Sequence, residues 1–114
     1  MIGAAVAAVF VAACQVPHPI SAADPVVALF GVHAVDAANV AECESGGDPA
    51  AISDTGDWGL FQINQVHAPW VHERWGWTMP DLLDPVKNTV VARALHRRQG
   101  WGPWYMSRRC HGLG

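Results

Sequence analysis

The sequence has no lysine or arginine before Arg74 and no acidic residue after Asp84. It contains no run of more than two lysine or arginine residues and none of the motifs of nucleic-acid-binding domains, so we expect no nucleic-acid partner. The uneven charge can place an acidic site against a basic flank, or it can reflect two ordinary solvated faces. Its 114 residues suffice for one small domain, and 51% hydrophobic with 15% charged residues argues against disorder.

The sequence also lacks a hydrophobic segment of transmembrane length near its start. The apolar run at residues 2–13, IGAAVAAVFVAA, is shorter than the roughly 20 residues that a membrane-spanning helix needs. It is followed by the small residues Ser21-Ala22-Ala23, which suit cleavage by signal peptidase. We interpret residues 1–23 as a signal peptide, although no lysine or arginine precedes the apolar run. Lipidation of Cys14, which follows Val-Ala-Ala, is an alternative, and a retained anchor is a third.

Histidine is plentiful, with six residues, but the H-E-x-x-H motif of zinc enzymes is missing. His67 and His72 are five positions apart in a segment that we predict to be a loop, which is a poor arrangement for metal ligands. We therefore expect neither a metal nor another cofactor.

Cysteine is scarce, with three residues, and one of them is Cys14 in the leader. The remaining Cys43 and Cys110 allow one disulfide, which would form in an oxidising compartment. Two buried free thiols are the alternative. A bridge across so long a loop would stabilise the domain by about 4 kcal/mol in the chain-entropy model.

A short helix is predicted over residues 36–45, with Asp36 as its N-cap and two glycines after it. On such a helix, Glu44 continues an apolar stripe at the 0, 3, 4, 7 spacing, whereas Glu42 lies on the opposite side. Burial raises the pKa of a carboxyl group, as a general acid at neutral pH requires. Glu44 is therefore a candidate general acid, and pairing with an arginine is the alternative.

The rest of the chain contains one strong helix signal. Residues 85–99 are predicted as a helix that Asp84 caps, that Pro85 begins and that Gly100 ends. We expect its buried face to consist of Val86, Val90, Val91, Ala94 and Leu95. Residues 24–35 form an N-terminal arm or a short helix, the turn-rich residues 48–58 predict a small irregular sheet or hairpin, and residues 65–80 resemble a loop.

Two motifs resemble those of a known superfamily. E-S-G-G at residues 44–47 and G-L-F-Q-I-N at residues 59–64 look like the paired motifs of soluble lytic transglycosylases and goose-type lysozymes. D-W-G-L-F-Q-I-N is also similar to the D-Y-G-x-x-Q-I-N stretch of c-type lysozymes. C-E-S-G-G with the later G-W-G-P-W and a cysteine resembles small secreted lysozyme-like domains of actinobacterial or phage type, including resuscitation-promoting factors. The resemblance covers residues 36–110.

The resemblance implies an α+β, mainly helical, lysozyme-like fold over residues 36–114, with a small β-hairpin and one disulfide. It implies a secreted, cell-wall-associated enzyme that cleaves the β-1,4 bond between N-acetylmuramic acid and N-acetylglucosamine in the glycan strands of peptidoglycan. It assigns Glu44 as the catalytic acid. We expect the protein to act as a monomer. A wall-binding module without catalytic activity is the alternative.

The mechanism stays open between two reactions. A hydrolase needs a second carboxylate, and Asp57 stands where c-type lysozymes have theirs, unless it is only a turn residue. A lytic transglycosylase can use Glu44 alone as acid and base and leave a 1,6-anhydro end. We favour the latter, although the tyrosine-bearing third motif of the large transglycosylases is not evident.

Substrate contacts are predicted around the two motifs. The candidates are Ser45, Gln62, Asn64 and Trp58, with bracing of the loop as the alternative for Gln62. Indole rings suit sugar faces, but buried tryptophans are more often part of a core. Each of the other five is therefore either core or cleft: Trp70, Trp75, Trp77, Trp101 and Trp104.

Overall fold

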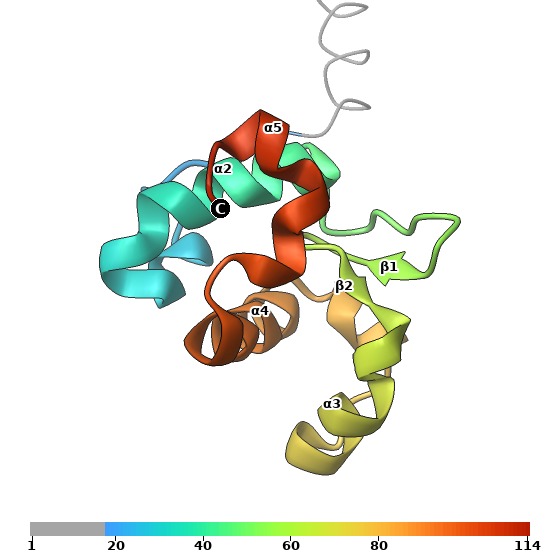
Figure 1. The fold of residues 1–114 in the computed structure, drawn as a ribbon. Helices are drawn as coiled ribbons and strands as arrows, with labels where there is room; N and C mark the ends of the chain where they lie inside the picture. Colours follow the sequence, from blue (N-terminus) through green and yellow to red (C-terminus); the bar gives the residue numbers. More distant parts are fainter. Residues whose placement is uncertain (1–17) are drawn as a thin grey trace, which may run out of the picture.

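The computed structural model of the protein describes residues 18–114 (Figure 1). Most of the predicted signal peptide, including the alternative lipidation site Cys14, lies outside the described residues. The described part is mainly helical with one two-stranded antiparallel sheet, which confirms the predicted α+β fold. Between residues 18 and 114, no helix has both the length and the hydrophobicity to cross a membrane.

Helix α2 (Ala34–Ser45) carries Glu44 in its last turn. It begins two residues before the predicted cap, because the 3-10 helix η1 (Val27–His33) leads directly into it. Gly46 ends it in the left-handed conformation, with a φ of 65°, and donates its N–H to the Glu42 carbonyl. The apolar stripe of α2 is buried and Glu42 is exposed, as the helix spacing predicts.

Helix α4 (Pro85–Gln99) has the predicted boundaries. The Asp84 carboxylate accepts hydrogen bonds from the N–H groups of Val86 and Lys87 at 2.8 and 3.4 Å. Its buried face differs from the prediction, because Val86 is 49% exposed whereas Asn88 is fully buried. A polar side chain therefore occupies a core position that the hydrophobic pattern did not reveal.

A short hairpin lies beside α4. Strand β1 (Asp57–Trp58) pairs with β2 (Ile63–Asn64), and Ile52 forms a further bridge to Trp58. Gly59 follows β1 with a φ of 77°, and a Cβ there would lie 2.4 Å from both the Asn88 side chain and the Leu82 carbonyl oxygen. Only glycine therefore allows the hairpin to approach α4 so closely.

Asn88 of α4 makes three side-chain hydrogen bonds, two to the hairpin and one to Leu82. Its Oδ1 accepts from the Phe61 N–H at 2.8 Å. Its Nδ2 donates to the carbonyl oxygens of Trp58 at 2.7 Å and Leu82 at 2.9 Å. Buried backbone groups need such partners because water cannot reach them. One side chain thus fixes the position of the loop that carries the second sequence motif.

The segment predicted as a loop at residues 65–80 is largely helical. It forms η2 (Gln65–His67) and α3 (Ala68–Trp75), and η3 (Pro80–Leu83) begins at its last residue. The proline of α3 lies in its first turn, where no backbone N–H is needed within the helix. Trp70 and Trp75 pack edge to face at 5.1 Å between ring centroids. Aromatic packing and a tolerated proline explain why a loop-like composition forms a helix.

The core lies between α2, α4 and the hairpin. The 3-10 helix η4 (Gly102–Ser107) crosses it, and the short helix α5 (Arg108–His111) returns the chain to α2 (Figure 1). The largest fully buried apolar side chains of the core are Phe30, Phe61, Leu60, Ile63, Leu82, Leu95, Val27, Val40, Val71 and Val91.

The predicted disulfide between Cys43 and Cys110 is confirmed, and it joins α2 to α5 across 67 positions of sequence. We expect the double variant Cys43→Ser/Cys110→Ser to lose about 4 kcal/mol of folding free energy, because the bond restricts the unfolded chain. Urea unfolding followed by tryptophan fluorescence measures the loss. Treating the wild-type protein with a thiol reductant should produce the same shift, and the variant should not respond to reductant. Equal midpoints for the oxidised wild type and the variant would contradict this expectation.

Candidate active site

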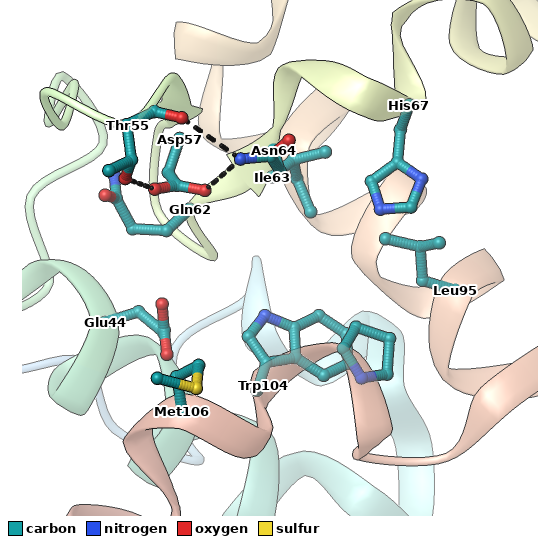
Figure 2. A pocket seen from close by; sticks show the side chains of 11 residues that line it. Glu44, Thr55, Asp57, Gln62, Ile63, Asn64, His67, Leu95, Trp104 and Met106 are labelled. Carbon is teal, nitrogen blue, oxygen red and sulfur yellow. Dashed lines mark hydrogen bonds between the residues drawn. The ribbon is translucent and has the colours of Figure 1, made fainter.

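A cavity of about 450 Å³ opens between the end of α2, the hairpin and η4 (Figure 2). Its polar wall includes Glu44 from α2 together with three side chains of the hairpin region, which are Asp57, Gln62 and Asn64. Its apolar wall includes Ile63, Leu95, Pro103, Trp104 and Met106. The cavity therefore brings both sequence motifs to one place and faces them with an apolar surface from the C-terminal part of the chain.

Glu44 is half-buried, and its carboxyl group points into the cavity (Figure 2). Burial raises its pKa, and the negative charge of Asp57 adds to the rise. A hydrogen bond from the Ser107 hydroxyl to Oε2 and the nearby His111 act in the opposite direction without cancelling it. Glu44 therefore keeps its proton to a higher pH than an ordinary glutamate does.

Asp57 lies on the other side of the same cavity, and its pKa is shifted in the opposite direction from that of Glu44. Burial opposes its ionisation, but three hydrogen bonds outweigh burial and lower its pKa. The hydroxyls of Ser53 and Thr55 each donate to Oδ2 at 2.6 Å, and the Asn64 amide donates to Oδ1 at 2.8 Å. Asp57 is therefore an ionised carboxylate at neutral pH.

The two carboxyl groups form a pair with separated pKa values. A carboxyl that keeps its proton and a carboxylate that stays ionised, facing one cavity, provide a proton donor and a fixed negative charge. These are the two components that acid-catalysed cleavage of a glycosidic bond can use.

Gln62 lies in the cavity wall and also braces the loop between the strands. It is the one non-glycine residue with a positive φ, 51°, among the residues that the structure describes. Its Nε2 donates to the carbonyl oxygens of Ala51 and Gly59 at 3.1 and 3.0 Å. These hydrogen bonds stabilise a backbone conformation that residues other than glycine rarely adopt.

The Asn64 side chain also forms hydrogen bonds with neighbouring residues. Its Nδ2 donates to Asp57 Oδ1 and to the Thr55 carbonyl oxygen, while its Oδ1 accepts from the Val66 N–H at 2.9 Å. Asn64 therefore orients Asp57 and caps η2 at the same time.

Ser45 and Trp58, the other two predicted substrate contacts, do not line the cavity. The Ser45 hydroxyl lies 2.7 Å from the Leu60 carbonyl oxygen and 3.1 Å from that of Ala41, so it ties the end of α2 to the hairpin. Trp58 is half-buried and packs against the core. Both residues hold the cavity walls in place from behind.

Trp104 supplies the indole of the cavity. It is 3% exposed, and its Nε1 donates to the Phe61 carbonyl oxygen at 2.9 Å. Trp104 thus belongs both to the core and to the cavity wall, which were predicted as alternatives. Met106, which is 90% exposed, forms the rim beside Glu44.

Three further polar residues at the site were not predicted from the sequence to be there. His67 lines the cavity, and burial with the charge of Arg98 lowers its pKa. Thr55 was recognised only as part of a turn. Ser107 contacts Glu44 from 63 positions away in the sequence, and no short motif encodes such a contact.

A metal site in a protein needs several His, Cys, Asp or Glu side chains close together. Within residues 18–114, no three His, Cys, Asp or Glu side chains gather closely enough to hold a metal ion.

Comparison with known proteins identifies one family. Residues 29–99 match the transglycosylase SLT domain, which spans α2, the hairpin, α3 and α4 and ends before η4. The matched segment contains Glu44 and Asp57, whereas Trp104 and Ser107 lie beyond it. No curated protein and no solved structure shows a significant match to the chain.

Proposed function

Because the chain belongs to the transglycosylase SLT domain family, we propose that it cleaves peptidoglycan as a lytic transglycosylase, at the β-1,4 bond between N-acetylmuramic acid and N-acetylglucosamine. One observation carries the proposal: Glu44, with its raised pKa, points into a cavity of about 450 Å³. Pockets of this size accommodate small ligands, so the cavity can hold a short part of a glycan strand.

Glu44 acts as acid and then as base in the proposed reaction. Its proton passes to the bridging oxygen while the bond from that oxygen to C1 of N-acetylmuramic acid breaks and positive charge develops on the sugar. The 6-hydroxyl of the same sugar then attacks C1 and returns its proton to Glu44. The products are a 1,6-anhydro end and a strand with a free 4-hydroxyl, and no water is consumed.

Asp57 stabilises the positive charge in this proposal. Its carboxylate is held by three donors and remains ionised, so its negative charge acts on the sugar without forming a bond to it. The second candidate function is a hydrolytic lysozyme in which Asp57 is the second catalytic carboxylate. The position of Asp57 in the same cavity as Glu44 favours this candidate.

We propose that Gln62 and Asn64 contact the sugar from the cavity wall, while Ser45 and Trp58 contribute indirectly by shaping it. Among the described residues, no hydrogen bond reaches Gln62 Oε1, so this oxygen can accept one from a sugar hydroxyl or an N-acetyl N–H.

We further propose that a monomer acts outside the cytoplasm at the cell wall, with residues 1–23 as a signal peptide or with Cys14 as a lipid anchor.

Mass spectrometry of digested peptidoglycan tests the proposed function. The purified protein is incubated with insoluble peptidoglycan, and the soluble fragments are weighed. Fragments one water lighter than hydrolytic products, with 1,6-anhydro ends, are the expected result. Ordinary reducing ends would establish the hydrolase instead. Binding to peptidoglycan without any released fragments would establish a wall-binding module.

Asp57→Asn tests the second carboxylate. We expect the rate to fall by roughly ten- to a hundredfold, because the variant loses a preorganised charge, while the products keep their 1,6-anhydro ends. The rate of fragment release and the product masses are measured together. Asp54→Asn is the matched control, since Asp54 is exposed in the neighbouring turn and should leave both unchanged. Hydrolytic products from the wild type, lost altogether in Asp57→Asn, would contradict the electrostatic role.

A further inference from the structure

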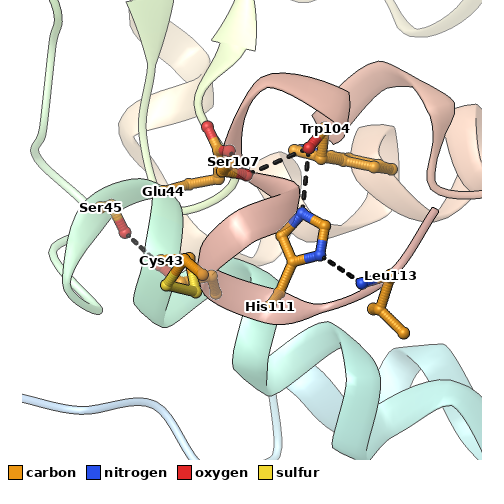
Figure 3. Close-up of a disulfide and its surroundings, with 9 residues drawn as sticks. Cys43, Glu44, Ser45, Trp104, Ser107, His111 and Leu113 are labelled. Atoms are coloured by element: carbon orange, nitrogen blue, oxygen red, sulfur yellow. Dashed lines mark hydrogen bonds between the residues drawn. A yellow bond between two sulfur atoms is a disulfide. The ribbon is translucent and has the colours of Figure 1, made fainter.

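Ser107 is a neighbour of Glu44 that the proposed function has not used. It ends η4, and its hydroxyl donates to Glu44 Oε2 (Figure 3). Among the described residues, no hydrogen bond reaches Oε1 of Glu44. The two oxygens of the carboxyl group are therefore distinguished, with Oε2 engaged by the protein and Oε1 left to the cavity.

The Ser107 hydroxyl has one hydrogen and two acceptors within reach. Besides Glu44 Oε2, the Trp104 carbonyl oxygen lies 3.1 Å from its Oγ. If Oε2 carried the proton of Glu44, that proton would point at Ser107, and the hydroxyl would turn to Trp104. If Oε1 carries the proton, Ser107 donates to Oε2 both before and after the proton leaves. Only the second arrangement directs the proton toward the cavity.

The surroundings of Trp104 favour that second arrangement. The Leu113 N–H donates to Nδ1 of His111 at 3.0 Å, so Nδ1 is an acceptor and the ring hydrogen lies on Nε2. This Nε2 lies 2.9 Å from the Trp104 carbonyl oxygen and donates to it (Figure 3). The Trp104 carbonyl oxygen thus already has a donor, whereas Ser107 is the one donor to Glu44 Oε2 among the described residues. After the proton has left, the hydrogen bond from Ser107 to the carboxylate becomes charge-assisted and stronger.

The contact between Ser107 and Glu44 is also held in place from both sides. Cys43 precedes Glu44, Cys110 follows Ser107 by three positions, and a disulfide joins the two cysteines (Figure 3). The hydroxyl therefore sits on a covalently anchored segment and needs no further ordering to meet the carboxyl group.

We propose that Ser107 is a positioning residue: it holds Oε2 of Glu44 so that Oε1 carries the proton to the glycosidic oxygen. The inference rests on the proposed function, because it assigns a role within the same reaction. The charged or titratable groups that act on Glu44 from its neighbouring elements are Asp57 of β1 and His111 of α5. Neither of them makes the hydrogen bond that Ser107 makes.

A direct titration of Glu44 tests the contact. The chain has three glutamates, so carbon-13 labelling of their side-chain carboxyl groups gives three resonances that can be followed against pH. We expect Ser107→Ala to raise the pKa of Glu44, since a donor to the ionised form is lost. Ser107→Thr, which keeps the hydroxyl, should titrate like the wild type. Glu42 serves as an internal control, and Thr78→Ala removes an exposed hydroxyl outside the cavity as the matched variant.

The pH–rate profile tests the role in the reaction. In Ser107→Ala we expect kcat to fall by roughly ten- to a hundredfold, because a misplaced catalytic group can cost about two orders of magnitude in rate. KM should change little, the limb of falling activity should move to higher pH, and Ser107→Thr should restore both rate and limb. A uniform loss without movement of the limb, or an unchanged Glu44 titration, would overturn the role of Ser107. A wild type that releases no glycan fragments would overturn the proposed function instead, so the two failures are distinguishable.

Discussion

Glu44→Gln is expected to lower the release of peptidoglycan fragments by about 10²–10⁴-fold, the range that a general acid typically contributes. Glutamine has the size of glutamate and can still accept a hydrogen bond from Ser107, but it has no acidic proton to give. Initial rates of fragment release, measured at saturating and at low peptidoglycan, determine the loss. Because the acid works on the transition state, the loss should appear in kcat rather than in binding to the insoluble substrate.

Glu42→Gln is the matched control, because the same change is made two positions away on the exposed side of α2. It should leave the rate unchanged. Wild-type activity in Glu44→Gln, or a large loss of activity in Glu42→Gln, would contradict the assignment of Glu44 as the catalytic acid.

Folding stability separates a chemical defect from an unfolded variant. The pKa of Glu44 is raised in the folded protein, so the wild type loses stability as the pH rises through that pKa. A neutral glutamine avoids this loss, and Glu44→Gln should be at least as stable as the wild type at neutral pH. The same raised pKa implies that activity falls as the pH rises through it, while the lowered pKa of Asp57 keeps activity until the pH is strongly acidic.

Asn88→Ala is expected to cost about 3–5 kcal/mol of folding free energy, the largest loss that we predict for a single side chain. It leaves one N–H and two carbonyl groups without their buried partner, and each unsatisfied group costs about 1–3 kcal/mol, although water entering the space would reduce the sum. Urea unfolding measures the change. Asn39→Ala is the control, because Asn39 is exposed on α2. Equal midpoints for the two variants would contradict the anchoring role of Asn88.

Loss of Asn88 should also reach the active site. The residue holds the loop between β1 and β2, and β1 carries Asp57. We therefore expect the remaining folded fraction of Asn88→Ala to cleave peptidoglycan more slowly than Asn39→Ala does.

Local signals in the sequence were sufficient for some elements of the fold. The boundaries of α4 follow from Asp84, Pro85 and Gly100, which act within one turn of the helix ends. The greater exposure of Glu42 compared with Glu44 follows from helical spacing alone. Such features depend on residues only a few positions apart, so they could be predicted without knowledge of the tertiary structure.

Other features depend on contacts between distant segments. Asn88 is polar and was not placed on the buried face of α4, because its three partners lie in the hairpin and in η3. Ser107 reaches Glu44 only after η4 has folded back across the core. Helix α3 was missed for a different reason, since its proline and tryptophans resemble a loop until their packing is known.

The position of the Cys43–Cys110 disulfide makes the geometry of the candidate active site depend on the redox state of the surrounding compartment. The bond lies next to the acid and three residues from the serine that holds it. A chain in a reducing cytosol lacks this bond, so the segment that presents Ser107 is not yet fastened to the helix that presents Glu44. Under the proposed function, the active site would therefore be complete only in an oxidising compartment outside the cytoplasm. The same covalent bond would then confine the proposed activity to that compartment.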